Sequence, residues 1–152
     1  MPSNIYFIYN QKIVVLSKDF KNVLLAKRQG EADYDETYTF IGGKMETTDE
    51  SLIAGMKREK DEEISINVTI KVLPNESYNV LYRKKDGDSV VVAHIPAVFV
   101  SGEITLNEEY SDYKWVDISK LDGFEPKVGN IPAITLWAKT KLAANDPGLV
   151  EI

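Results

Sequence analysis

The sequence predicts an α/β sandwich built around a mixed β-sheet. Most of the chain consists of short runs rich in β-branched and aromatic residues, which are typical of strands. Two segments are predicted as helices instead, one after Gly42-Gly43 and one with Pro132 in its first turn. Two helices beside a mostly β body favour a layered α/β arrangement. Because the chain has no internal repeat, low-complexity tract or linker, we expect one domain over residues 1–152.

The first half of the chain is expected to begin with two strands, over residues 12–17 and 23–27, which a polar turn joins. The segment "TYTFI" predicts a short third strand that runs into the two glycines. Thr48 or Asp49 is a suitable N-cap for the first helix, which is expected to end near residue 64. The glycines therefore connect a strand to a charged helix.

The second half of the chain is rich in strands before it becomes helical. Asp86-Gly87 predicts a hairpin turn between strands over residues 78–83 and 89–95. "YKWVDISKL" predicts a last strand that runs into a turn, and "NIPAITLWAKTKLAA" predicts the second helix. The final segment, from about residue 145 to residue 152, is expected to form a flexible tail, as chain ends commonly do.

Composition excludes several classes of protein. The net charge of −6 argues against a broad surface for nucleic acid or for anionic membranes. The chain has no cysteine, so disulfides, thiolate metal sites and cysteine nucleophiles are excluded. No apolar run has the roughly 20 residues of a membrane helix, and the first residues do not resemble a signal peptide. We expect a cytoplasmic protein that binds a small molecule, with homodimer formation left open.

The first predicted helix carries an unusual set of carboxylates. At about 100° per residue, Leu52, Met56, Glu59 and Glu63 lie within about 60° of one another. Leu52 and Met56 are expected to face the core, so the two glutamates should leave the same side of the helix. Glu62 lies beside them. Converging carboxylates favour a hard divalent cation, Mg²⁺ or Mn²⁺, because such ions prefer oxygen ligands. A solvated acidic helix end is the alternative.

The segment over residues 43–66 resembles the Nudix hydrolase box, G-x5-E-x7-R-E-U-x-E-E-x-G-U, in which U is an aliphatic residue. The residues that match this pattern in register are Glu50, Arg58-Glu59, Glu62-Glu63 and Ile66. The strand before the glycines and the later segment "NEEYSDYKWVDISKL" are similar to the parts that flank the box in this family. The resemblance implies a Nudix-type α/β/α sandwich with a mixed β-sheet.

Three positions depart from the box. Gly43 stands seven residues before Glu50 instead of six, so the loop between them has one extra residue. Lys60 occupies an aliphatic position, and Ser65 replaces the glycine that ends the helix. None of these changes removes a carboxylate.

The resemblance also implies roles for the residues of the box. Glu59 and Glu63 would be the main metal ligands, and the Gly43 carbonyl would be a further ligand. Glu62 would be an additional ligand or a base that acts through water. Glu50 would pair with Arg58 and hold the entrance of the helix.

Outside the box, Glu109 is the candidate for a further metal ligand or the general base. Its distance from Trp115 suits a glutamate that several Nudix groups carry in this loop, and a solvated loop carboxylate is the alternative. His94, the only histidine, is expected to be structural. The candidates for contact with a substrate are Lys27 and Arg28, Lys44, and Tyr38. The first two are equally expected as solvated cations, and core packing is the favoured alternative for Tyr38.

The implied activity is Mg²⁺-dependent hydrolysis of a diphosphate linkage in a nucleoside diphosphate derivative. A (d)NTP pyrophosphohydrolase is favoured, because the short chain leaves little room for a second recognition domain. NDP-sugars of the GDP-mannose or ADP-ribose type are the alternative substrates. The alternative class is a nucleotide-sensing Nudix domain without turnover. The isopentenyl diphosphate isomerase branch of similar fold employs a cysteine, which this chain lacks.

Overall fold

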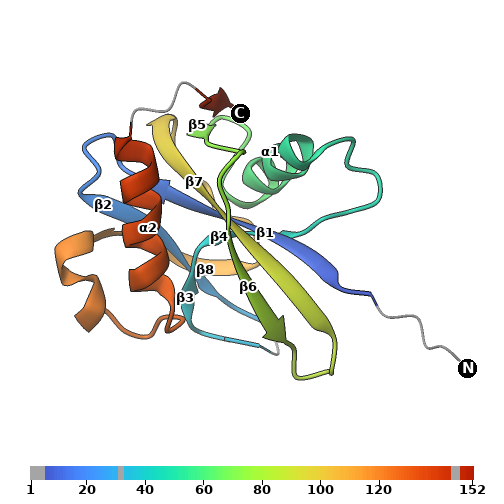
Figure 1. Ribbon diagram of the computed structural model, residues 1–152. Coiled ribbons are helices and arrows are strands. Elements are labelled where there is room, and N and C mark those ends of the chain that lie inside the picture. Colours follow the sequence, from blue (N-terminus) through green and yellow to red (C-terminus); the bar gives the residue numbers. More distant parts are fainter. Residues whose placement is uncertain (1–5, 31–32, 145–147) are drawn as a thin grey trace, which may run out of the picture.

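The computed structural model describes residues 6–30, 33–144 and 148–152, and it confirms a mixed sheet with helices (Figure 1). The strands are β1 (Ile8–Leu16), β2 (Asn22–Arg28), β3 (Tyr38–Thr39), β4 (Ile41–Lys44), β5 (Thr69–Val72), β6 (Tyr78–Arg83), β7 (Ser89–Ser101), β8 (Tyr110–Asp117) and β9 (Val150–Glu151). The helices are α1 (Leu52–Glu63), the 3-10 helix η1 (Ile118–Gly123) and α2 (Ile131–Ala143). None of the helices within these ranges is long and apolar enough to cross a membrane.

The strands form one sheet whose main path runs β3-β2-β1-β7-β5-β9. β1 and β7 are parallel, from Ile8 opposite Val90 to Leu16 opposite Val98. β4 pairs with β1, β8 with β2 and β6 with β7, all antiparallel. The hairpin predicted at Asp86-Gly87 is confirmed by the pairing of β6 with β7. As a result, strands from both halves of the chain lie side by side in the sheet.

β1 is buried on both faces and separates two layers of core. Ile13 belongs to the cluster that contains Met56 of α1, whereas Val14 belongs to the cluster that contains Ile134 of α2. Successive side chains of a strand point to opposite faces of the sheet, so the run "IVVL" supplies both clusters. One helix therefore covers each face, as Figure 1 shows and as the predicted sandwich requires.

Gly42 allows β4 to approach β1 closely. Its φ angle of +124° lies in a region that favours glycine. A Cβ atom at this position would lie 2.0 Å from the carbonyl oxygen of Gln11, so no other residue fits there without a shift of the backbone. In the strand register Gly42 faces Lys12. The glycine turn is thus fixed to β1, and it leads into the loop before α1.

The start of α1 differs from the prediction. Ser51 is the N-cap, and its side chain accepts a hydrogen bond of 3.0 Å from the Ala54 N–H, so Thr48 and Asp49 precede the cap. Leu52, predicted in the core, is 52% exposed. The later start places Leu52 at the first helical position, and Ile53 packs against the core instead.

The end of the chain also differs from the prediction of a flexible tail. Residues 145–147 lie outside the described part, but β9 pairs with β5. The Ile152 N–H donates to the Ile70 carbonyl at 2.9 Å, and the Ile70 N–H donates to the Ile152 carbonyl at 3.1 Å. The side chain of Ile152 lies in the core cluster on the α1 face. The last residues therefore complete the edge of the sheet.

Candidate active site

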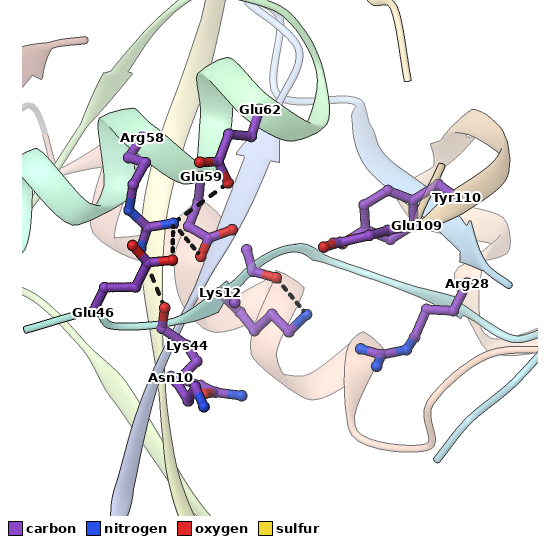
Figure 2. A pocket seen from close by; sticks show the side chains of 12 residues that line it. Asn10, Lys12, Arg28, Lys44, Glu46, Arg58, Glu59, Glu62, Glu109 and Tyr110 are labelled. Atoms are coloured by element: carbon purple, nitrogen blue, oxygen red, sulfur yellow. Dashed lines mark hydrogen bonds and ion pairs between the residues drawn. The ribbon is translucent and has the colours of Figure 1, made fainter. Parts of the chain in front are cut away.

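A polar cavity of about 280 Å³ lies beside α1 and the glycine turn (Figure 2). Its walls come from β1, β2, β4, α1 and the start of β8. It brings together most of the residues that the sequence singles out, namely Arg28, Gly43, Lys44, Arg58, Glu59, Glu62 and Glu109. In Figure 2 the α1 side chains lie on one side, Arg28 and Glu109 lie on the other, and Lys12 lies between them.

Glu63 carries a buried carboxylate next to this cavity. Its Oε1 atom accepts a hydrogen bond of 2.9 Å from the Gly42 N–H and one of 2.6 Å from the Tyr110 hydroxyl. Its Oε2 atom is buried and accepts no hydrogen bond from the described residues. Burial raises the pKa of Glu63 well above its usual range, and the neighbouring Glu59 carboxyl adds to the rise. A cation at this point would remove the cost of holding the carboxylate charged.

Arg58 ties the acidic side chains around it together. Its Nη1 atom donates to Glu59 Oε1 at 3.0 Å and to Glu62 Oε2 at 3.4 Å. Asp49 binds the same guanidinium at two points, with 2.8 Å from Nε to Oδ1 and 2.9 Å from Nη2 to Oδ2. The hydrogen bonds from Arg58 lower the pKa of Asp49 to about 2. Arg58 therefore fixes the start of the helix to its carboxylate-bearing side.

The partner of Arg58 is a correction to the prediction, since Asp49 and not Glu50 makes this bidentate contact. Glu50 is exposed and lines neither this cavity nor the second one described below. The Glu46 N–H donates to Asp49 Oδ2 at 2.9 Å, and the Asp49 N–H donates to the Glu46 carbonyl at 3.0 Å, so a turn between these two residues positions the Asp49 carboxylate. The acidic partner of Arg58 is therefore Asp49, which stands six residues after Gly43.

The donors present fit a divalent metal, although they are not assembled around one point. As they stand, no three acidic or histidine side chains within the described ranges converge into a complete cation site. Arg58 holds Glu59 and Glu62, and Glu63 keeps one oxygen without a hydrogen-bond donor. At Gly43 an added Cβ would lie 2.9 Å from Glu59 Oε1, so the missing side chain leaves room for that carboxylate. All these donors are oxygens, which Mg²⁺ and Mn²⁺ prefer.

Lys12 is a site residue that the sequence did not reveal. Its side chain is only 8% exposed, and its Nζ atom donates to the Gly42 carbonyl at 3.0 Å. Burial lowers the pKa of Lys12 to about 8, and the charge of Glu63 opposes this change most strongly. The one available signal was a lysine directly before the buried run "IVVL". Only the pairing of β1 with β4 shows that this lysine reaches the carboxylates.

Glu109 reaches the cavity from the loop before β8. Its backbone is held on both sides, because the Gln29 N–H donates to the Glu109 carbonyl at 3.0 Å and the Glu109 N–H donates to Asn107 Oδ1 at 3.1 Å. The next residue, Tyr110, is buried and hydrogen-bonded to Glu63. The side chain of Glu109 itself is directed toward the cavity (Figure 2). The structure thus brings this loop carboxylate to the α1 cluster.

A second cavity, of about 580 Å³, adjoins the first. The two cavities share Asn10, Lys12, Arg28 and Lys44. The remainder of its wall is largely apolar and aromatic, and includes Phe40, Tyr34, Tyr82, Val92 and Ile131. Its volume lies within the range of about 300–1,000 Å³ that is typical of small-molecule sites. Cations therefore stand where a polar cavity meets an apolar one.

Two residues predicted to contact a substrate line neither cavity. Lys27 forms an ion pair of 3.5 Å with Glu36. Tyr38 is buried and donates its hydroxyl hydrogen bond to Asp112. Lys27 points away from the cavities because successive side chains of a strand point to opposite faces. Arg28, the next residue of β2, reaches the cavities instead. Tyr38 is a core residue, which was the favoured alternative.

His94 lies in the wall of the second cavity as a neutral side chain. Burial lowers its pKa to about 4. Its Nδ1 atom lies 2.9 Å from the Tyr78 carbonyl and must donate, because a carbonyl oxygen only accepts. The ring also makes an edge contact with Phe40, with 5.7 Å between centroids. These contacts agree with the structural role expected for this histidine.

The two departures at the end of the box have local explanations. Lys60 is buried, and its Nζ atom donates to the Val68 carbonyl at 2.6 Å, so its stem replaces an aliphatic side chain while its charge is hydrogen-bonded. Ser65 adopts a φ angle of +119°, which a glycine would adopt at less cost. Its hydroxyl accepts a hydrogen bond of 3.0 Å from the Asn67 N–H. The chain therefore turns at a positive φ angle after the helix although the residue there is not glycine.

The sheet between two helices, with an acidic helix after a glycine turn, defines an α/β domain of the Nudix type. The family model of the NUDIX domain matches residues 10–136, and the chain belongs to this family. Members of the family are generally hydrolases of nucleotide pyrophosphate bonds. None of the curated proteins matches the chain.

Several solved structures share this fold. The MutT protein of Methanosarcina mazei Go1 has a TM-score of 0.67 and 22% identity, over 90% of this chain and 95% of that one. A C. elegans Ap4A hydrolase has a TM-score of 0.70 and 16% identity, over 91% and 99% of the two chains. The NUDIX domain of Shewanella oneidensis NrtR, in complex with ADP ribose, has a TM-score of 0.72 and 19% identity, over 91% and 90%. At these identities the likeness shows the fold alone.

Proposed function

We infer that the protein hydrolyses a diphosphate linkage in a nucleoside diphosphate derivative, with Mg²⁺ as cofactor and (d)NTPs as the favoured substrates. The observation that carries this proposal is the position of the cations. Lys12, Arg28 and Lys44 line both cavities, between the α1 carboxylates and an apolar wall. An anionic diphosphate that carries an aromatic group at one end matches this arrangement of carboxylates, cations and apolar wall.

The carboxylates would hold the metal. Glu59 and Glu63 are the main candidate ligands, with Glu62 and the Gly43 carbonyl as additional ones. Mn²⁺ is an alternative to Mg²⁺, since both prefer oxygen donors. The bound cation would neutralise phosphate oxygens and lower the pKa of attacking water. Arg58 is hydrogen-bonded to Glu59 and Glu62, and Asp49 holds Arg58 in place.

The remaining steps belong to residues of the cavity walls. Arg28 and Lys44 would bind phosphate oxygens and orient the chain of the substrate across the junction of the cavities. Glu109 would accept the proton of the attacking water, because it is exposed to the cavity and is not among the ligands on α1. Glu62 is the alternative base. The second cavity would receive the nucleobase of the substrate, because Tyr34, Phe40 and Tyr82 offer aromatic surface there.

A nucleotide-sensing domain without turnover is the second candidate. It is supported by Arg58, which occupies oxygens of both Glu59 and Glu62, so that these carboxylates must be released before they can act together on a metal. NDP-sugars of the GDP-mannose or ADP-ribose type stay as alternative ligands or substrates in either case. Turnover separates the two candidates.

The test is a panel of (d)NTPs, GDP-mannose and ADP-ribose, each incubated with the protein in Mg²⁺, in Mn²⁺ and in EDTA. Mass spectrometry identifies the products, and ¹⁸O-water locates the phosphorus that is attacked. We expect metal-dependent release of a nucleoside monophosphate. The Glu63→Gln variant should lose this activity, and the Glu50→Gln variant should keep it. Glu50 is the matched control, because it lies on the same segment but outside both cavities. Tight binding of a nucleotide with no product in any metal would favour the sensing domain.

A further inference from the structure

Lys12 carries a buried positive charge beside the candidate site. It lies on β1, where every residue from Gln11 to Leu16 is buried, and its own side chain is 8% exposed. Burial of an ammonium group is costly, and lysine is seldom buried without a partner. A neutral side chain of similar length would serve a purely structural role at less cost. The charge itself therefore requires an explanation.

The surroundings of this ammonium group are those of a cation site. Its Nζ atom donates to the Gly42 carbonyl oxygen at 3.0 Å. The carboxylates of Glu63, Glu59 and Glu109 attract it, whereas the guanidinium of Arg28 repels it. An ammonium group has three donors, and among the described residues Nζ has only this one hydrogen-bond partner. Carbonyl and carboxylate oxygens are also the donors that a divalent metal takes.

Lys12 also lies where the two cavities meet. It lines both, together with Asn10, Arg28 and Lys44. In Figure 2 its chain extends between the α1 carboxylates and Arg28. Of the three shared cations it is the buried one, since Arg28 is half-buried and Lys44 is exposed. A buried cation with spare donors at this junction is placed to bind an anion that extends across it.

We propose that Lys12 is a resident cation of the site, which opposes metal binding to the carboxylates in the free protein and binds a phosphate group of the substrate at the junction of the cavities. This inference rests on the proposed metal-dependent function. It adds that one positive charge of the site belongs to the chain itself. Removal of that charge should therefore strengthen the binding of a metal and weaken the binding of a diphosphate.

Three substitutions separate the charge from the hydrogen bond. Lys12→Met removes both, Lys12→Gln keeps an amide that can donate to the Gly42 carbonyl, and Lys12→Arg keeps the charge. Lys71→Met is the matched control, because it removes a lysine charge from an exposed position on β5 that lines neither cavity. Circular dichroism checks that each variant is folded.

The first measurement is Mn²⁺ binding to the substrate-free protein, followed by electron paramagnetic resonance. We expect Lys12→Met and Lys12→Gln to bind Mn²⁺ about tenfold more tightly than the wild type, since a nearby positive charge is lost. Lys12→Arg and Lys71→Met should stay close to the wild type. The second measurement is calorimetry of methylenediphosphonate in EDTA. The two neutral Lys12 variants should bind it at least about tenfold more weakly.

Unchanged or weaker Mn²⁺ binding in folded Lys12→Gln would overturn the proposal, because a structural role predicts that the amide replaces the ammonium group. Unchanged diphosphonate affinity in both neutral variants would overturn it as well. If the wild type bound no Mn²⁺, the metal site of the proposed function would fail, and this inference with it. If the wild type bound Mn²⁺ and only the Lys12 effects were missing, the proposed function would stand without Lys12.

Discussion

Asp49 holds the guanidinium of Arg58 at two points, at 2.8 and 2.9 Å, and so joins the loop before α1 to the second turn of the helix. Bidentate pairs of this kind are among the stronger hydrogen-bonded contacts. Asp49→Asn should therefore lower the melting temperature, because a neutral amide can accept from only one arm of the guanidinium. Glu50→Gln should leave it nearly unchanged. Thermal melts followed by circular dichroism compare the two, and an equal loss in Glu50→Gln would return the pairing to Glu50.

The proposed metal site is predicted to depend on Glu63. Glu63→Gln removes the charge but keeps an oxygen that can accept from the Gly42 N–H and the Tyr110 hydroxyl, so the fold should be retained. We expect the affinity for Mg²⁺ and Mn²⁺ to fall at least about tenfold. Calorimetry on the free protein measures this loss. Glu103→Gln, at an exposed position outside both cavities, is the control. A Glu59→Gln/Glu63→Gln double variant with normal metal affinity would rule out the assignment.

The general base is predicted to be Glu109. Once a substrate is known, Glu109→Gln should lower kcat by about 10²-fold or more, which is the usual effect of losing a general base. The Mg²⁺ affinity of the free protein should be nearly intact. Glu108→Gln is a close control, because Glu108 precedes Glu109 in the same loop but does not line either cavity. A near-normal kcat in Glu109→Gln would transfer the role to Glu62.

The positive φ angle of Ser65 is predicted to strain the turn after α1. At a φ angle of +119° a glycine avoids a conformational cost of about 1 kcal/mol, but Ser65→Gly also loses the hydrogen bond from the Asn67 N–H. Ser65→Ala loses the same hydrogen bond and keeps the Cβ atom. We therefore expect Ser65→Gly to be more stable than Ser65→Ala by about 1 kcal/mol in urea unfolding. Equal stability of the two variants would mean that the turn is not strained.

His94 should make stability depend on pH. Its pKa is about 4 in the folded chain and near 6.5 when unfolded, so the unfolded chain binds the proton more readily between these values. The contribution of neutral His94 to stability is thus fully present above pH 6.5 and is lost as the pH falls toward 4. The full effect corresponds to about 3 kcal/mol. Urea unfolding of the wild type and His94→Gln across this pH range measures the contribution of His94 to stability. If both proteins lost the same stability as the pH fell, His94 would make no such contribution.

Much of the fold could be predicted because its signals are local. The buried run at residues 13–16, the Asp86-Gly87 turn and the two helical segments each follow from a few neighbouring residues. β9 could not be predicted, because a strand of two residues has no period, and it forms only where the edge of β5 is available. The strand register across the sheet is likewise set by tertiary contacts.

The candidate site was predictable to the extent that it lies on one helix. The spacing of Glu59, Glu62 and Glu63 indicates a shared location by helical geometry alone. Lys12 depends on the pairing of β1 with β4, which no local pattern gives. The choice of Asp49 and not Glu50 as the partner of Arg58 depends on the turn in which the Glu46 N–H donates to Asp49. Spacing alone therefore placed the helical carboxylates but not their partners from loops and strands.

The parallel pairing of β1 with β7 also determines when the protein can acquire its shape. Ile8 and Val90 are about 80 residues apart along the chain, and contacts of such long range slow folding. During synthesis the pairing of β1 with β7 can form only after β7 has left the ribosome. Tyr110, which holds Glu63, emerges later still. The nascent β1 can pair early with β2 and β4, but its edge toward β7 stays open until residue 101 is made, and the carboxylate cluster is one of the last features to be assembled.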